Sequence, residues 1–149
     1  MRWRRLVIAL ASAASLLAPA QAQTLLRSPQ QISHCLCQNR VVDELKVALD
    51  QQWRLYEEAR RRYAALEDQV DAVKVRMDVH DRDQVESFQR LLDQRDAAQR
   101  AFQDEATPAY SAAVERYNSA VETYNGSCAD AVFDPDVLAQ VQLGLYCPR

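Results

Sequence analysis

The stretch that decides the fold is residues 42–73, VDELKVALDQQWRLYEEARRRYAALEDQVDAV, where apolar side chains recur at alternating intervals of three and four. This spacing places one stripe of side chains along a single helix face, as in the seam of a coiled coil. The stripe extends in both directions: Cys35, Gln38, Val42, Leu45, Leu49, Gln52, Tyr56, Ala59, Tyr63, Leu66, Val70, Val73 and Met77. We therefore expect one long helix that packs against a partner helix along its whole length.

The composition around this stretch also favours helix. Neither glycine nor proline occurs in residues 30–106, and the two glycines, Gly126 and Gly144, lie near the carboxyl end. The residues between are rich in Ala, Leu, Glu, Gln and Arg, which are good helix formers. No alternating run of β-branched residues indicates a strand. The sequence therefore predicts an all-α chain.

The first helix is expected over about residues 29–79. Ser28 suits the N-cap position, Pro29 the first helical position, and Gln31 the place of a capping-box partner. A polar cluster at residues 78–83 follows, and we interpret it as a solvent-exposed turn rather than as a catalytic cluster.

The second helix is expected over about residues 83–126. Asp83 followed by Glu86 repeats the capping-box pattern. One uninterrupted helix is the competing interpretation, because neither glycine nor proline marks the turn. A weaker seam continues through Val85, Phe88, Leu92, Arg95, Gln99 and Phe102. Thr107 and Pro108 then predict either a kink or a restart of the helix.

Beyond Pro108 the pattern becomes regular again, with Tyr110, Tyr117 and Tyr124 recurring at intervals of seven. We interpret these tyrosines as core residues rather than as a stacking surface for sugars or bases. Gly126 is expected to end this helix as a C′ glycine. A short third helix over residues 135–143, stopped by Gly144, should fold back over the base of the hairpin.

The four cysteines test this topology. The midpoint of Cys35 and Cys128 lies between residues 81 and 82, inside the turn located from the capping pattern. Cys35 lies in the seam, whereas Cys37 is rotated by about 200° from it. We therefore prefer Cys35 paired with Cys128 and Cys37 with Cys147, as a clamp at the base of the hairpin. The alternative, Cys37 with Cys128 and Cys35 with Cys147, shifts the implied turn by only one residue and stays open.

The amino terminus has the pattern of a secretory signal peptide. Three arginines within residues 1–5 precede an apolar run at residues 6–17, and Ala20 and Ala22 form an A-x-A exit before Gln23. The apolar run is too short to span a bilayer. We expect residues 1–22 to be removed, and residues 23–149 to form one periplasmic or secreted domain without membrane insertion.

Removal of this leader takes away Arg2, Arg4 and Arg5 and changes the formal net charge from −3 to −6. An acidic chain argues against nucleic acid as a partner. We expect instead a protein partner or self-association through the helix faces. The candidate interface residues are the aromatic side chains of the two arms, with Trp53, Tyr56 and Tyr63 the ones expected to be exposed: Trp53, Tyr56, Tyr63, Tyr110, Tyr117 and Tyr124.

Two classes of function fit these patterns. The first is a non-enzymatic coiled-coil scaffold, adaptor or chaperone-like protein without cofactor. The chain resembles the bacterial periplasmic chaperones with long helical tentacles in its leader, length and antiparallel helices, but it differs in its acidic charge and four cysteines, and we do not assign it to them. The second is a binder of a small ligand or soft metal at the base, with His34, Cys35 and Cys37 as alternative ligands. No combination of nucleophile and base indicates an enzyme.

Overall fold

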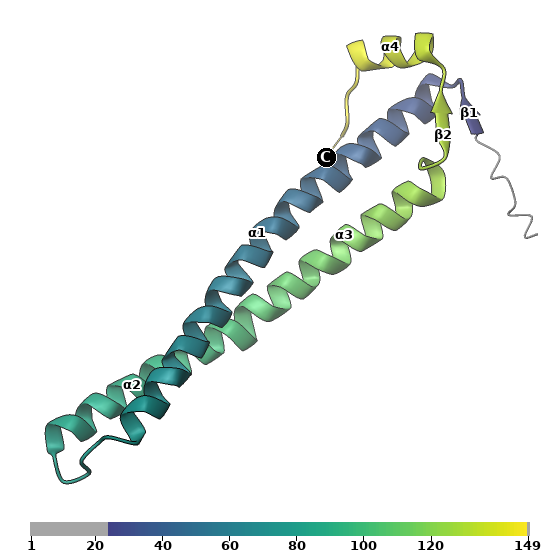
Figure 1. Ribbon diagram of the computed structural model, residues 1–149. Helices are drawn as coiled ribbons and strands as arrows, with labels where there is room; N and C mark the ends of the chain where they lie inside the picture. Colours follow the sequence, from purple (N-terminus) through teal and green to yellow (C-terminus); the bar gives the residue numbers. More distant parts are fainter. Residues whose placement is uncertain (1–23, 149) are drawn as a thin grey trace, which may run out of the picture.

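The computed structural model describes residues 24–148, so the predicted leader lies outside the described part. Two long antiparallel arms join at a turn, and a short helix crosses the opposite end (Figure 1). The first arm is α1 (Pro29–Lys74). The return arm is α2 (Arg82–Arg100), the π-helix η1 (Ala101–Ala106) and α3 (Thr107–Ser127), and α4 (Pro135–Leu143) follows. The predicted helical hairpin with a short C-terminal helix over its base is confirmed.

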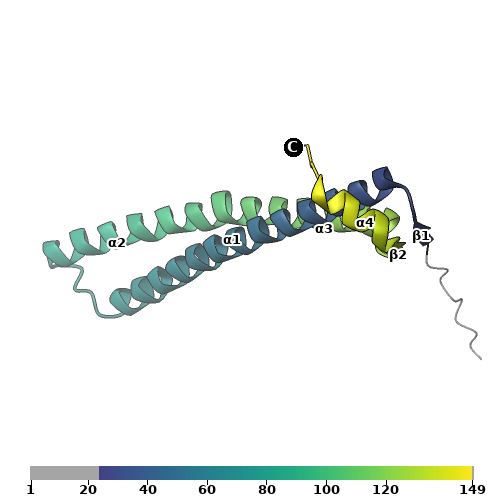
Figure 2. The ribbon, with the colours of Figure 1, turned by 90° about the horizontal axis from the view of Figure 1, so that it is seen from above.

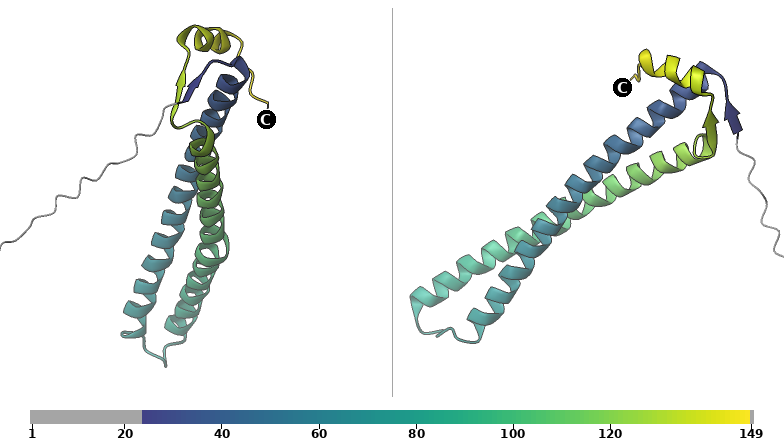
Figure 3. Two further views of the ribbon diagram at one scale, coloured as in Figure 1. Left: turned by 90° about the vertical axis from the view of Figure 1, so that its right-hand side faces the viewer. Right: turned by 45° about the horizontal axis from the view of Figure 1, so that its top comes forward.

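The molecule is long and thin. With 46 residues, α1 is about 69 Å long at 1.5 Å per residue. Figure 2 and Figure 3 show the two arms from other directions, with α4 at the end away from the turn. We call the two arms the shaft, and the end that carries α4 the base.

The heptad seam faces the return arm as predicted. Every member of the stripe from Cys35 to Met77 is buried or half-buried, whereas neighbours outside it, such as Val47 and Trp53, are exposed. Within the shaft, however, only four apolar side chains on the described residues are buried away from the base, and none of them completely: Leu66, Val70, Ala98 and Ala113. The shaft therefore has a thin core, as expected of two helices that cover only one side of each other.

The main core lies at the base. Ile32 is completely buried there, next to Leu26, Val141 and the Cys35–Cys128 disulfide. Half-buried side chains from α1, α3, and α4 with its flanks complete the cluster: Leu36, Tyr124, Ala131, Phe133, Val137, Leu138 and Leu145. The base thus holds both arms through apolar packing and a covalent bond.

The base also contains two short strands, which the sequence did not predict. β1 (Thr24–Leu26) and β2 (Ala131–Phe133) pair in parallel, with Leu25 opposite Val132. The Asp134 N–H donates to the Leu26 carbonyl at 3.0 Å and extends this pairing. Three-residue strands leave no alternating pattern, and these two meet only because the hairpin brings the chain ends together.

The turn occupies residues 75–81, so α1 ends at Lys74, five residues earlier than expected. The N-cap of α2 is Asp81 rather than Asp83, because the Asp81 carboxylate accepts hydrogen bonds from the N–H groups of Asp83 and Gln84. The Gln84 side chain donates to Asp81 at 2.9 Å and accepts from the Asp78 N–H at 3.0 Å. Gln84, and not Glu86, is therefore the side chain that supports this cap.

Thr107 and Pro108 lie in a continuous helical stretch, so the helix does not restart there. The six-residue π-helix η1 precedes them, and the Thr107 N–H bonds to the Phe102 carbonyl five residues back. The Thr107 hydroxyl donates to the same carbonyl at 2.8 Å. A wider turn accommodates a proline, which lacks an N–H and clashes with the preceding turn of a regular α-helix.

Ser28 is the N-cap of α1 and Pro29 its first residue, as predicted, although the Ser28 hydroxyl donates to Gln30 and makes no capping bond. The predicted end of the second helix at Gly126 is wrong. Gly126 lies inside α3, which continues to Ser127 with Cys128 as its cap, and no residue in the described part has a positive φ. The predicted bounds of the short third helix match α4, where Asp134 is the N-cap and Gly144 the C-cap.

Candidate functional site

Aromatic side chains from both arms form one cluster in the middle of the shaft. Trp53 and Tyr56 on α1 stack at 5.6 Å between ring centroids, and both contact Tyr110 on α3, at 5.3 and 5.2 Å. Phe102 in η1 lies 5.4 Å from Tyr56 and 6.1 Å from Tyr63. These five residues, the aromatic cluster, join α1 to the return arm where the π-helix lies.

Trp53 is the exposed member of this cluster. Its relative exposure is 45%, although its ring packs on Tyr56 and Tyr110. The expectation that Tyr56 and Tyr63 are exposed as well is wrong, because both lie in the seam and are half-buried against the return arm. Beside Trp53, a shallow depression on α1 is lined by side chains of both charges: Arg54, Glu57, Glu58 and Arg61.

The charges beside Trp53 are held in place by a local ion pair. The Arg60 guanidinium donates two hydrogen bonds to the Glu57 carboxylate, at 2.9 and 3.0 Å. These bonds lower the pKa of Glu57. Arg61 donates to the Glu57 carbonyl at 3.2 Å. The surface around Trp53 is therefore ordered by contacts within α1.

Polar side chains interrupt the seam between the aromatic cluster and the turn. Arg95 on α2 lies 3.7 Å from the Glu67 carboxylate on α1 and donates to Asp96 at 2.7 Å. A hydrogen bond between the Tyr63 hydroxyl and Glu67 raises the pKa of Tyr63. A polar layer of this kind defines the register of two packed helices, since a shifted register would leave Arg95 without its partner.

The remaining tyrosines of the seven-residue ladder point into the hairpin. Tyr117 is half-buried in the shaft, and Tyr124 packs on the apolar core of the base. With Tyr110 inside the aromatic cluster, the ladder does not form an open stacking surface. The structure thus places five of the six predicted interface residues along the seam between the arms, and only Trp53, beside the seam, reaches well into solvent.

Both disulfides lie at the base. Cys35 is bonded to Cys128 and Cys37 to Cys147, which is the first of the two pairings left open by the sequence. Cys35 and Cys128 are each 3% exposed, whereas Cys37 and Cys147 are half-buried. The inner bond closes the hairpin and the outer bond ties the C-terminal segment to α1.

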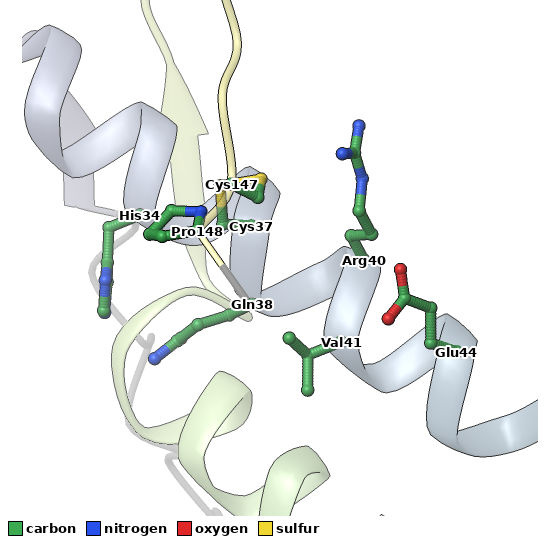
Figure 4. Close-up of a pocket in the computed structure, with 8 residues that line it drawn as sticks. All are labelled: His34, Cys37, Gln38, Arg40, Val41, Glu44, Cys147 and Pro148. Atoms are coloured by element: carbon green, nitrogen blue, oxygen red, sulfur yellow. A yellow bond between two sulfur atoms is a disulfide. The ribbon is translucent and has the colours of Figure 1, made fainter.

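A small pocket borders the outer disulfide (Figure 4). Its volume is about 250 Å³, and it is lined by residues of α1 and of the C-terminal segment: His34, Cys37, Gln38, Arg40, Val41, Glu44, Cys147 and Pro148. This volume lies below the roughly 300–1,000 Å³ typical of small-molecule sites.

The alternative metal site at His34, Cys35 and Cys37 is not formed. Both cysteines are oxidised in disulfides, whereas a cysteine binds a metal ion as the thiolate. Among residues 24–148, no three side chains of the ligand-forming types His, Cys, Asp and Glu come together in a way that could hold a metal ion. His34 is exposed, without either sulfur available to complete a ligand set.

The carboxylates of the polar cluster at the turn accept hydrogen bonds from backbone N–H groups. The Asp78 carboxylate accepts from the His80 N–H at 2.9 Å, and Asp81 caps α2 as described above. Hydrogen bonds from Gln84 and Asp83 lower the pKa of Asp81. These carboxylates are used in shaping the turn, in agreement with the interpretation of the cluster as a solvated loop.

A row of apolar side chains beside the seam of α1 was not recognised from the sequence. Val41 and Leu55 are 47% and 49% exposed, and Ala48 lies between them at the same seven-residue spacing. This row flanks the seam on the side of Leu45, whereas Trp53 flanks it on the other side. A search for heptad positions beside the seam would have found it.

No helix in the described part of the chain is long and apolar enough to cross a membrane. Comparison with known proteins gives no further assignment: no family model, no curated protein sequence and no solved structure matches this chain.

Proposed function

We propose that this chain is a non-enzymatic, extracytoplasmic interaction protein, in which a rigid helical shaft presents Trp53 to a protein partner. Two disulfides are typical of an oxidising environment outside the cytoplasm. The leader pattern at residues 1–22 supports export to the periplasm or secretion. The shape supports a scaffold or adaptor role, because a thin shaft has much surface for its mass.

The observation that carries this proposal is the combination of exposure and order at Trp53. The ring is 45% exposed, yet it stacks on Tyr56 and contacts Tyr110 across the hairpin. An aromatic side chain that is already ordered loses little conformational entropy on binding. Tryptophan is among the residues that most often dominate binding energy at protein interfaces.

The base offers less support for the second class of function. The pocket beside the outer disulfide is small, and the sulfurs of Cys35 and Cys37 are both used in disulfides. The pKa shifts of Glu57, Tyr63 and Asp81 arise from hydrogen bonds that order a helix, the interhelix contact and the turn. We therefore favour an interaction protein over a ligand binder or an enzyme.

The proposal can be tested with a photoreactive phenylalanine analogue introduced at position 53 of the full chain, expressed in its native compartment. Irradiation should give one discrete adduct with a different protein. The matched control places the same analogue at Asn118, an exposed residue on the outer face of α3, and should give no such adduct. Absence of an adduct from position 53, or an adduct only with a second copy of this chain, would overturn the proposal.

A further inference from the structure

The side of the shaft that carries Val41, Ala48 and Leu55 is incompletely covered. Leu45 and Leu49 belong to the seam but remain half-exposed, because α3 presents small side chains such as Ala113 and Ala120 opposite the upper part of α1. A shallow hollow of about 440 Å³ lies over this region, lined by one residue of α1 and five of α3: Leu45, Glu115, Arg116, Ser119, Ala120 and Thr123.

The same face therefore carries both a ridge and a hollow. The ridge is the row Val41, Ala48 and Leu55 on α1, and the hollow lies beside it over the small residues of α3. The two features lie at similar heights along the shaft, since in this hairpin Cys35 is opposite Cys128 and Trp53 is opposite Tyr110. A twofold axis parallel to the shaft places the ridge of one copy over the hollow of another.

Charges at the edges of this face match in the same arrangement. By the hairpin register, Arg40 lies level with Glu122, and Glu44 lies within one helical turn of Arg116. In a parallel pair, α1 of one copy meets α3 of the other, so each of these arginines lies within one helical turn of a carboxylate along the shaft. Within residues 24–148, none of these four side chains takes part in an intramolecular ion pair.

We infer that this face binds a second copy of the chain, in a parallel dimer with both bases at the same end. Four helices then enclose the leucines that two helices leave half-exposed, the usual solution for helical bundles. A face two helices wide, about 20 Å, and about 30 Å long buries on the order of 600 Å² per copy, at the lower limit of stable interfaces. The dimer should therefore dissociate in the micromolar range. Trp53 lies on the opposite side of the seam and stays free for another partner.

Sedimentation equilibrium of the oxidised protein between 1 and 100 µM tests this inference. We expect a monomer–dimer equilibrium for the wild type and a monomer for Leu55→Glu, a substitution at an exposed position that should leave the melting temperature unchanged. Glu44→Arg alone and Arg116→Glu alone should each weaken the dimer at least tenfold. The double variant Glu44→Arg with Arg116→Glu should restore it, because the pairs are re-formed with their signs exchanged.

The control variant Trp53→Ala should leave the dimer unchanged, whereas the photoreactive analogue at position 53 reports on the different protein partner alone. That contrast separates failure of the dimer from failure of the proposed function. A wild type that is monomeric at 100 µM would overturn the inference. So would a double charge exchange that fails to restore dimerisation, or a dimer that Trp53→Ala dissociates.

Discussion

Trp53 on α1 and Tyr110 on α3 lie with their ring centroids 5.3 Å apart, and the midpoint of their residue numbers is the same as that of the disulfide-bonded Cys35 and Cys128. The return arm therefore keeps one register from the base to the middle of the shaft. Next to this pair, Tyr56 contacts both Tyr110 and Phe102, which are eight residues apart rather than the seven of the tyrosine ladder. The aromatic cluster thus marks the place where the two arms adjust to each other.

Removal of Tyr110 from the aromatic cluster should destabilise the hairpin. Tyr110→Leu keeps an apolar side chain but loses the ring contacts with Trp53 and Tyr56, each worth about 0.5–1.5 kcal/mol. We expect a loss of about 1–3 kcal/mol in urea unfolding. Trp53 is the only tryptophan in residues 24–148, so its fluorescence should also shift to longer wavelength. Tyr117→Leu, outside the cluster, is the control, and an equal effect there would contradict this account.

The two disulfides should substitute for each other. Their ends are only two residues apart on α1 and nineteen apart in the C-terminal part of the chain. When one bond is present, the second therefore closes only a short additional loop. Replacement of one cysteine pair by serine should lower the free energy of unfolding by about 3 kcal/mol. Loss of both opens a loop of more than 90 residues and removes a large part of a typical domain stability. Thermal melts by circular dichroism of the three variants would show this, and an additive pair of small losses would contradict it.

The π-helix should be removable without loss of the fold. Deleting Gln103 removes the additional residue between Phe102 and Tyr110, and Pro108→Ala removes the clash that a regular helix would meet there. We expect the combined variant to melt at the wild-type temperature or above. Deletion of Glu115, within regular α3, should instead rotate the residues that follow by about 100° and unfold the base. Circular dichroism distinguishes the two, and equal damage would contradict the role given to η1.

Ionisation of Tyr63 should contribute to unfolding in alkali. Because Glu67 raises its pKa in the folded state, Tyr63 favours folding at pH values below its unfolded pKa of about 10, and this contribution is lost as the pH rises through the folded pKa. Tyr63→Phe should therefore lose less stability between pH 9 and 11.5 than the wild type. Tyr146→Phe, at a residue that is 81% exposed, should behave like the wild type. Identical alkaline profiles for all three proteins would exclude this linkage.

The local patterns of this chain determined its helices, its seam and the approximate place of the turn. A seven-residue repeat defines a helix face without reference to any other part of the chain, so every member of the stripe from Cys35 to Met77 is buried or half-buried as predicted. The preference for Cys35 with Cys128 came from the same source, because the residue facing the partner helix follows from its register. The bounds of α4, between Asp134 and Gly144, were also readable from the sequence.

Tertiary structure decided what depends on two distant segments at once. The one additional residue between Phe102 and Tyr110 is accommodated by a π-helix. Both aromatic rings face α1 in this arrangement, and the wider turn leaves room for Pro108. β1 and β2 pair only where the closed base brings the chain ends together. The exposure of Trp53, and the burial of Tyr56 and Tyr63 beside it, depend on how much of each ring the opposite arm covers. A sequence repeat gives the direction of a side chain, but the size and position of its neighbours decide whether water reaches it.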